Sequence, residues 1–342
     1  MKKILTGLMM LGLASVFAIA IAAQGQLTGA GATFPFPIYS KWFDTYSKMK
    51  SVQINYQSVG SGAGIRQVTS GTVDFGASDG PMTDEQIAAY QKDRGTAIYH
   101  FPTVIGAIVP TYNIPGVNVA LKFTQKAIAD IYLDKITKWN DAEISKANPG
   151  VQLPGEDIVV VHRSDGSGTT YIFTDFLSKI SEEWKSKVGR NSSVNWPKGL
   201  GGKGNEGVSG LVKQTPYSLG YVELIFALQN NLPYGDVQNA SGAFVKASLE
   251  TTTAAAAAAA KDMPADFRVS ITNAPGKTAY PICSFTWLLI PGKIPDAGKR
   301  DTLKGFLLWM LTDGQKDTEA LYYAPLPKQV VQQELKAISK IQ

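Results

Sequence analysis

Short apolar runs alternate along this chain with segments in which large side chains have helical spacing. The runs lie at residues 52–57, 73–77, 103–109, 158–162, 220–222 and 284–290. Apolar runs of this length are typical of buried strands, and strands that alternate with helices form layered α/β domains. The alternation therefore predicts an α/β protein built around a largely parallel sheet.

Amphipathic helices are predicted between these runs. Pro35 and Pro37 fit at or near the first turn of a helix, where a missing N–H costs little. Aromatic side chains then recur at helical spacing, and we interpret them as core: Tyr39, Trp42, Phe43 and Tyr46. Thr83 and Gln86 have the spacing of a capping box, which predicts a helix to about residue 92. The alanine-rich segment 251–262 favours a surface helix, to which we assign no function.

Chain length, charge and rare residues narrow the class of protein. At 342 residues a single core is near its size limit, which favours two lobes. Cys283 is the only cysteine, which excludes an internal disulfide and a thiolate-rich zinc site. His100 and His162 leave few candidates for histidine-based metal or triad chemistry. The net charge of +5 is too small and too evenly spread to indicate a nucleic-acid partner.

The first residues have the organisation of a signal peptide. Lys2 and Lys3 precede the apolar run ILTGLMMLGLASVFAIAIAA, which ends in small residues. This pattern predicts export, with removal of residues 1–23 by cleavage near Ala22 or Ala23. A retained membrane anchor is the alternative, although Gly, Thr and Ser dilute the run. No cysteine directly follows the run, so a lipoprotein anchor is excluded.

Three segments place a small, hydroxyl-bearing turn just before a predicted helix. They are AGATF around Thr33, VGSGAG around Ser61 and RSDGSGTT around Ser167. A helix N-terminus presents unpaired N–H groups and a partial positive charge, while glycines allow a ligand to approach the backbone closely. Ordinary capping explains any one such turn. Three such turns in one chain, with Arg163 beside the last, predict that their donors converge on one bound oxyanion.

Five segments follow one another over nearly the whole exported chain: LTGAGATFPFPIYSKW, TVDFGASDG, VHRSDGSGTT, GLGGKGNEGVSGLVKQTPYSLGYVE and YAPLP. In sequence and in order they resemble the periplasmic phosphate-binding proteins of phosphate ABC transporters. The combination of DGSGT, FGASD and GAGATFP is specific, whereas any one of them alone is not. The region 238–277 departs most from the family, so its details are not carried over.

The resemblance implies a set of phosphate ligands in this chain. They are Thr33, Phe34, Ser61, Asp79, Arg163, Ser167, Gly168 and Thr169. Phe34 and Gly168 would act through backbone N–H groups, and Asp165 would orient Arg163 and offset its charge. His162 is interpreted as a strand residue. Helix N-termini can hold phosphate without a metal, so no cofactor and no metal are expected.

Asp79 is the unusual member of this set, because a carboxylate repels an anion and loses hydration when buried. It fits a ligand that brings its own proton, as hydrogen phosphate and dihydrogen phosphate do and sulfate at neutral pH does not. Arsenate has the same proton pattern, so this mechanism does not exclude it. The alternative from spacing alone is that Asp79 caps the turn before Pro81.

Two other functions fit parts of the sequence. GASDG, residues 76–80, matches the nucleophile elbow of serine hydrolases with Ser78 as nucleophile, but Pro81 follows at once and no histidine lies near the C-terminal end. The other function is the binding of sulfate, molybdate or tungstate. Asp79 argues against it, because a fully deprotonated oxyanion has no proton to donate to a carboxylate. GLGGKGNEG, residues 199–207, does not match a P-loop and is interpreted as an irregular loop at the cleft or the lobe surface.

The resemblance implies a two-lobed, type II-like periplasmic binding protein fold with the ligand cleft between the lobes. Residues 25–107 and 284–342 would form lobe one, and residues 108–283 lobe two. The expected function is capture of inorganic phosphate in the periplasm by a monomer that is not an enzyme. Phosphate bridging both walls would favour the closed form, which would deliver it to the membrane permease subunits.

Overall fold

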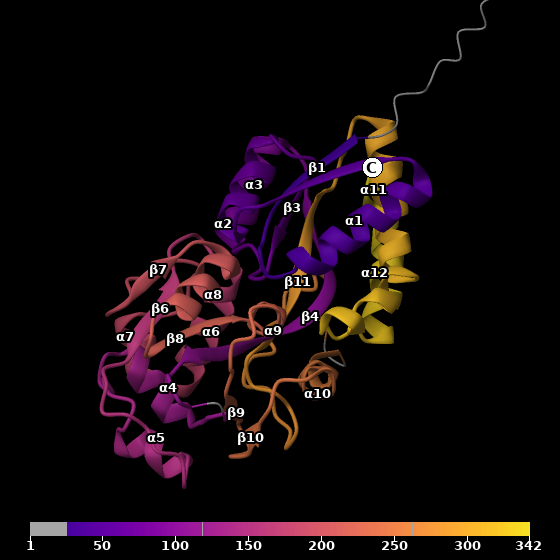
Figure 1. The fold of residues 1–342 in the computed structure, drawn as a ribbon. Coiled ribbons are helices and arrows are strands. Elements are labelled where there is room, and N and C mark those ends of the chain that lie inside the picture. Colours follow the sequence, from indigo (N-terminus) through magenta and orange to yellow (C-terminus); the bar gives the residue numbers. More distant parts are fainter. Residues whose placement is uncertain (1–25, 118, 261–262) are drawn as a thin grey trace, which may run out of the picture.

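The computed structural model describes residues 26–117, 119–260 and 263–342 (Figure 1). The predicted signal peptide, residues 1–23, and its cleavage near Ala22 or Ala23 lie outside the described residues. The strands are β1 (Gln26–Gly31), β2 (Gln53–Ser58), β3 (Phe75–Ser78), β4 (Ile98–Asn113), β5 (Lys122–Phe123), β6 (Val159–Arg163), β7 (Leu200–Gly202), β8 (Ser218–Glu223), β9 (Asp236–Gln238), β10 (Phe244–Val245) and β11 (Cys283–Pro291).

The helices alternate with these strands. They are α1 (Phe36–Lys50), α2 (Ser61–Ser70), α3 (Asp84–Arg94), α4 (Gln125–Tyr132), α5 (Ala142–Ala147), α6 (Gly168–Ile180), α7 (Glu182–Lys187), α8 (Gly204–Gln214), α9 (Leu224–Gln229), α10 (Leu249–Ala260), α11 (Ala297–Leu311) and α12 (Lys328–Ala337), with 3-10 turns η1 (Gly314–Asp317), η2 (Glu319–Leu321) and η3 (Ile338–Lys340). Within the described ranges, none of them is long and apolar enough to cross a membrane.

Local sequence signals place most of these elements correctly. Each of the six predicted strands is present, and the run at 103–109 forms the middle of the longer β4. The predicted capping box begins α3, since the Gln86 N–H donates to Thr83 Oγ1 and the Thr83 N–H donates to Gln86 Oε1. The alanine-rich segment forms α10, with Ala255 and Ala256 buried on one face.

Eight strands of the described chain form one sheet, in the order β2–β1–β3–β11–β4–β8–β6–β7. β1 is parallel to β2 and β3, and β6 is parallel to β7 and β8. β4 and β11 lie between these two groups and are antiparallel to their neighbours. The prediction of a largely parallel sheet is therefore correct within each group and wrong at the centre, where the chain crosses in β4 and returns in β11.

The sheet divides the molecule into two halves (Figure 1). We call β1–β3 with α1–α3, α11 and α12 the β1 half, and β6–β8 with α4 and α6–α9 the β6 half. The long strand β4 joins them, because its residues 98–107 pair with β11 and its residues 108–113 pair with β8. A separate three-stranded sheet, β10–β9–β5, adjoins the β6 half. The lobe boundaries expected at 107/108 and 283/284 remain predictions.

Each half has its own aromatic core. In the β1 half the Phe43 ring centroid lies 5.2 Å from that of Phe306. In the β6 half Phe173 stacks on Tyr221 at 4.3 Å and meets the Tyr132 ring edge at 4.8 Å. The four aromatic residues predicted to line α1 are buried there, which confirms their interpretation as core. The two aromatic clusters lie on either side of the junction between the halves, where the predicted site residues are found.

Candidate functional site

The predicted site residues lie at the carboxyl ends of parallel strands. Thr33 and Phe34 follow β1, Ser61 follows β2, and Asp79 follows β3. Arg163 is the last residue of β6, and residues 167–169 follow it at the start of α6. In open α/β sheets the crevice outside the carboxyl ends of the strands is where ligands bind. Here two such crevices, one from each half, meet.

The three predicted turns do precede helices, but only one acts as an ordinary cap. Ser167 Oγ accepts a hydrogen bond from the Thr170 N–H at 3.0 Å and caps α6. The residues before α1 and α2 make no side-chain cap, so the hydroxyls of Thr33 and Ser61 are not used for that purpose. Capping therefore explains Ser167 and leaves the other two hydroxyls for another role.

The two halves contact each other directly at these residues. The Gly168 N–H donates to Ser61 Oγ at 3.0 Å, and the Gly62 N–H donates to the Gly166 carbonyl oxygen at 2.9 Å. A Cβ atom on Gly168 would lie 2.6 Å from the backbone nitrogen of Asp79. The absence of that Cβ lets the first turn of α6 approach Asp79, so the halves are closed around the site.

Three hydroxyl groups at this junction each accept two hydrogen bonds from nitrogen donors. Thr33 Oγ1 accepts from the backbone and side-chain nitrogens of Asn205, at 3.2 and 2.9 Å. Thr169 Oγ1 accepts from Arg163 Nη1 at 3.2 Å and from Asn205 Nδ2 at 3.1 Å. Ser61 Oγ accepts from the N–H groups of Asp79 and Gly168, at 3.3 and 3.0 Å.

These contacts fix the direction in which the hydroxyls can act. A hydroxyl has two acceptor lone pairs and one hydrogen. Because both lone pairs of each oxygen already have donors, each group has only its hydrogen left to offer. The N–H group of Thr169, in the first turn of α6, adds a donor that has no partner within the helix, whereas the N–H group of Gly168 donates to Ser61 Oγ in this structure. The junction is therefore rich in donors.

Arg163 is held by a carboxylate of its own loop. Its Nε and Nη2 donate to the two oxygens of Asp165 at 2.7 and 2.6 Å, and only 3% of the residue is exposed. Burial alone would raise the pKa of Asp165, but the hydrogen bonds and charge of Arg163 outweigh it and hold that pKa below its usual value. The ion pair keeps the guanidinium plane fixed and its Nη1 directed at Thr169.

Asp79 is the acceptor among these donors. The residue is 1% exposed, and its Oδ1 accepts from the Thr286 hydroxyl at 2.8 Å. Burial raises its pKa to about 7, although the hydrogen bond from Thr286 and the charge of Arg163 act in the opposite direction. The turn before Pro81 is held by Ser78, whose Oγ accepts from the Gly80 N–H. The alternative that Asp79 caps this turn is therefore wrong.

Phe34 and His162 have mainly structural contacts. The Tyr323 hydroxyl donates to the Phe34 carbonyl oxygen at 2.6 Å and holds the turn after β1. His162 lies in β6, as predicted, and its ring stacks on Trp196 at 5.0 Å between centroids. No group of three or more His, Cys, Asp or Glu residues in the described ranges could hold a metal ion.

The serine hydrolase alternative does not fit this geometry. Ser78 is buried, and its hydroxyl donates to the carbonyl oxygen of Gly80 within its own turn. His100 Nε2 accepts from the Met82 N–H, and burial lowers the His100 pKa to about 4. Neither His100 nor His162 is among the hydrogen-bond partners found for Ser78, so the elbow has no base.

The segment 199–207 is not the irregular loop that the sequence predicted. It forms β7 and the first turn of α8, with Gly204 at φ +73° between them. The turn places Asn205 at the centre of the junction, where sequence reasoning had no site residue. Thr286, on β11, was also missed. The glycine-rich segment 199–204 is a fourth turn of small residues before a helix, and this pattern could have indicated Asn205 as a site residue. No local pattern indicated Thr286.

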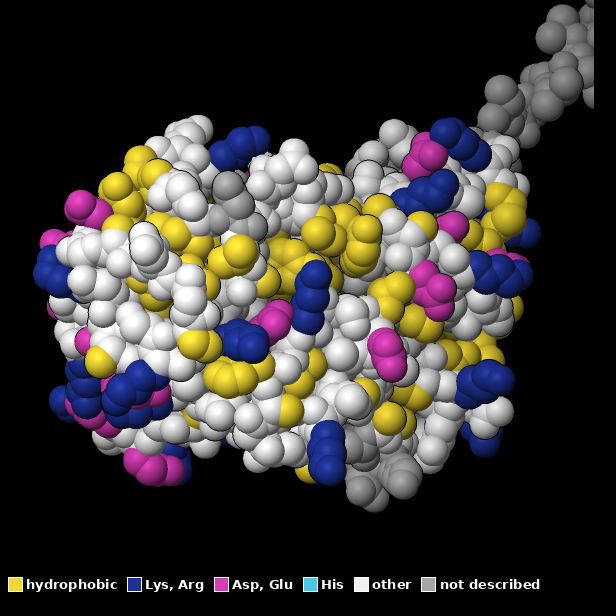
Figure 2. Space-filling model, turned by 60° about the horizontal axis from the view of Figure 1, so that its bottom comes forward, with side chains coloured by type: hydrophobic (Ala, Val, Ile, Leu, Met, Phe, Trp, Pro, Cys, Tyr) yellow, Lys and Arg dark blue, Asp and Glu magenta, His cyan; other side chains and the backbone are white. Residues whose placement is uncertain are grey.

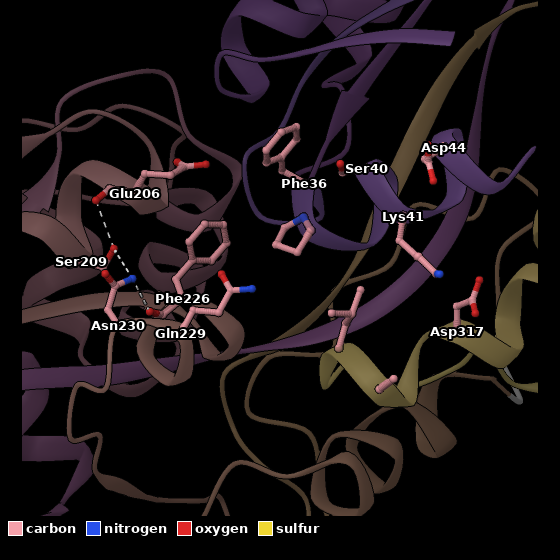
Figure 3. Close-up of a pocket in the computed structure, with 13 residues that line it drawn as sticks. Phe36, Ser40, Lys41, Asp44, Glu206, Ser209, Phe226, Gln229, Asn230 and Asp317 are labelled. Atoms are coloured by element: carbon pink, nitrogen blue, oxygen red, sulfur yellow. Dashed lines mark hydrogen bonds between the residues drawn. The ribbon is translucent and has the colours of Figure 1, made fainter. Parts of the chain in front are cut away.

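A groove of about 770 Å³ lies between α1 and the α8–α9 pair, so both halves line it. Figure 3 shows Phe36 and Lys41 on the α1 side, opposite Glu206 and Phe226. Figure 2 shows one face of the molecule, on which basic and acidic side chains are interspersed and apolar side chains gather near the middle. The groove adjoins the junction, because Glu206 follows Asn205 directly in α8.

The fold and the junction together identify the general class of this protein. Two α/β halves, joined by crossing strands and meeting at the carboxyl ends of their parallel strands, form a two-lobed binding protein. In agreement, the family model described as "PBP superfamily domain" matches residues 18–314.

Comparisons with known proteins narrow the class. A Phosphate-binding protein PstS from Xylella fastidiosa (strain Temecula1) is 45% identical over 309 residues, which cover 90% of this chain and 83% of the relative. One from Methanocaldococcus jannaschii is 41% identical over 332 residues, which cover 91% and 85%. The chain belongs to the PstS family of phosphate-binding proteins.

Solved structures support the fold at greater evolutionary distance. A phosphate-binding protein from Stenotrophomonas maltophilia has a TM-score of 0.69 at 19% identity, covering 91% of this chain and 93% of its own. A human phosphate-binding apolipoprotein has a TM-score of 0.73 at 20% identity, with the same coverage. At this level of identity the likeness concerns the fold alone.

Proposed function

We propose that this protein captures inorganic phosphate, as hydrogen or dihydrogen phosphate, and delivers it to the permease of an ABC transporter for import. The observation that carries the proposal is the junction itself, where fixed donors surround one buried carboxylate. Membership of the PstS family supports it, because the relatives are named for phosphate binding.

The proposed ligands come from both halves. They are Thr33, Phe34, Ser61, Asp79, Arg163, Ser167, Gly168 and Thr169. Hydroxyl hydrogens, backbone N–H groups and the guanidinium supply donors for the phosphate oxygens without a metal. Asp165 supports the set by holding Arg163.

Selectivity follows from Asp79. A pKa of about 7 means that this carboxyl is partly protonated at neutral pH. Hydrogen phosphate keeps an O–H hydrogen at neutral pH and donates it to the ionised carboxylate. Sulfate has no proton to share and meets the Asp79 carboxylate with repulsion alone. A sulfate or molybdate carrier would have no use for this carboxylate.

Phosphate that contacts both halves binds the closed form more tightly than the open form and shifts the population towards closure. We assign lobe one to residues 25–107 and 284–342 and lobe two to residues 108–283, so that the chain crosses within β4 and just before β11. The protein would act as a monomer in the periplasm after removal of residues 1–23 near Ala22 or Ala23. Its role is binding and delivery, without a catalytic step.

The test is calorimetric titration of the exported chain, freed of bound phosphate by unfolding and refolding, with phosphate and then with sulfate. We expect saturable phosphate binding that sulfate does not match above the Asp79 pKa of about 7. Arg163→Gln should weaken phosphate binding by at least about tenfold, because hydrogen bonds to a charged ligand are lost. Ser218→Ala is the matched control for a buried polar residue away from the ligands, since its hydroxyl donates to the Val212 and Thr215 carbonyl oxygens. Equal affinity for both anions, or unchanged binding by Arg163→Gln, would contradict the proposal.

A further inference from the structure

Asn205 lies at the centre of the junction, although it is not among the proposed ligands. The side chain is fully buried in the first turn of α8. Its Nδ2 donates to Thr33 Oγ1 of the β1 half at 2.9 Å and to Thr169 Oγ1 of its own half at 3.1 Å. One amide nitrogen therefore connects a hydroxyl from each wall.

The orientation of this amide is fixed from its other end. Asn205 Oδ1 accepts a hydrogen bond from the Glu223 N–H at 3.0 Å. A backbone N–H can only donate, so the amide oxygen must face β8 and the NH2 group must face the two threonines. Both NH2 hydrogens are then used, one on each hydroxyl oxygen.

This arrangement determines how the threonines meet an anion. Each oxygen also has a second donor, the Asn205 N–H for Thr33 and Arg163 Nη1 for Thr169. A threonine hydroxyl that could accept from one side and donate to the other would be free to rotate away from the ligand. With both lone pairs occupied, the hydrogen is the only group that each hydroxyl can present.

We propose that Asn205 is a positioning residue for anion recognition: it orients the hydroxyls of Thr169, within its own half, and of Thr33, once the halves are closed, as donors to the bound phosphate. This inference rests on the proposed function and adds a residue to it. It also explains why a neutral amide occupies this position. A carboxylate there would accept the hydroxyl hydrogens and take them from the ligand.

A double-mutant cycle separates positioning from a purely structural role. Asn205→Ala is compared in the unchanged chain and in a chain that carries Thr33→Val and Thr169→Val, with phosphate affinity measured by calorimetry. We expect a loss of about tenfold in the first background and less than about threefold in the second, because the hydroxyls through which Asn205 acts are gone. A similar loss in both backgrounds would overturn the proposal.

Asn205→Asp provides a second test that preserves shape if the alanine variant fails to fold. We expect the ratio of its phosphate affinity to that of the unchanged chain to be low at alkaline pH and to rise as pH falls, because a protonated carboxyl regains one donor. A ratio that does not change with pH would contradict the assignment. Ser218→Ala, a buried residue of β8 whose hydroxyl donates to the Val212 and Thr215 carbonyl oxygens, should remain within about twofold of the unchanged chain. Absence of phosphate binding by the unchanged chain would instead refute the proposed function, and the assignment with it.

Discussion

Replacing Asp79 by asparagine is the most direct test of how the site distinguishes two tetrahedral anions. The amide is nearly the same size as the carboxyl, carries no charge and offers N–H hydrogens in place of an acceptor. Asp79→Asn therefore removes the repulsion that sulfate meets, and it removes the partner for the phosphate O–H. We expect sulfate affinity to rise relative to phosphate affinity.

The expected size follows from the burial and pKa of Asp79. Losing a hydrogen bond between the phosphate O–H and a charged group should cost about ten- to a hundredfold in phosphate affinity. In the unchanged chain sulfate can bind only when Asp79 carries the proton. Since burial raises that pKa to about 7, sulfate affinity should be level below this pH. Above it, sulfate affinity should fall about tenfold for each pH unit as the protonated fraction declines.

Phosphate should behave differently, because hydrogen phosphate keeps an O–H hydrogen at neutral and alkaline pH and donates it to the ionised Asp79. Below the Asp79 pKa of about 7 a proton must be released on binding, whereas above it no proton is exchanged. Phosphate affinity of the unchanged chain should therefore fall in acid and hold at the higher pH values, where sulfate affinity falls. Calorimetric titrations of both anions between about pH 6 and pH 9 would show this. An unchanged sulfate-to-phosphate ratio in Asp79→Asn, or sulfate binding by the unchanged chain that is independent of pH, would refute the reasoning.

Three further substitutions test separate parts of the structure. In the unchanged chain the Thr286 hydroxyl donates to Asp79 and lowers the Asp79 pKa. Thr286→Val should therefore raise that pKa, and the pH above which sulfate affinity falls should move upward. Calorimetric titration with sulfate at several pH values would show no such move if the hydrogen bond is unimportant. Gly168→Ala places a Cβ 2.6 Å from the Asp79 nitrogen and should weaken phosphate binding by more than about tenfold, with little change in the thermal stability of the ligand-free chain. Unweakened binding would show that the halves need not approach so closely. Glu334, on α12, is buried without a hydrogen-bond partner for either oxygen, and burial raises its pKa well above the ordinary value. The folded state thus holds this proton more tightly than the unfolded state, and stability is lost as pH rises. Glu334→Gln should stabilise the chain increasingly as pH rises, by about 1.4 kcal/mol for each pH unit above the ordinary glutamate pKa until the pKa of the folded state is reached, with little gain in acid. Thermal unfolding curves that shift equally at all pH values would contradict this.

The parts of the fold that sequence predicted were those with local causes. Apolar runs reveal buried strands because burial requires apolar side chains, and Thr83 with Gln86 begins α3 whatever lies around it. The first strand was missed for the opposite reason. Its sequence, QLTGAG, is not an apolar run, and the structure shows why small residues are needed: a Cβ on Gly29 would lie 2.2 Å from the ring of Phe75. That constraint comes from another strand.

The same division applies to the site. Turns that precede helices can be found from sequence, because the N-terminal signal is carried by neighbouring residues. The contacts that give those turns their chemistry span long distances along the chain. Asn205 reaches Thr33 across 172 residues, and Thr286 reaches Asp79 across 207. Spacing within a segment does not contain this information, so both residues were missed.

The distribution of donors between the halves implies an order of events. Thr169 receives both of its hydrogen bonds from its own half, through Arg163 and Asn205, and is oriented before closure. Thr33 receives both of its hydrogen bonds from Asn205 across the junction, and Ser61 receives one from Gly168. The β6 half is thus prepared to take phosphate first, while the hydroxyls of the β1 half gain their fixed direction only as the halves meet. Since Asp79 also belongs to the β1 half, the proposed function implies that sulfate would be rejected at closure: an anion without a proton would be held weakly by one wall and released.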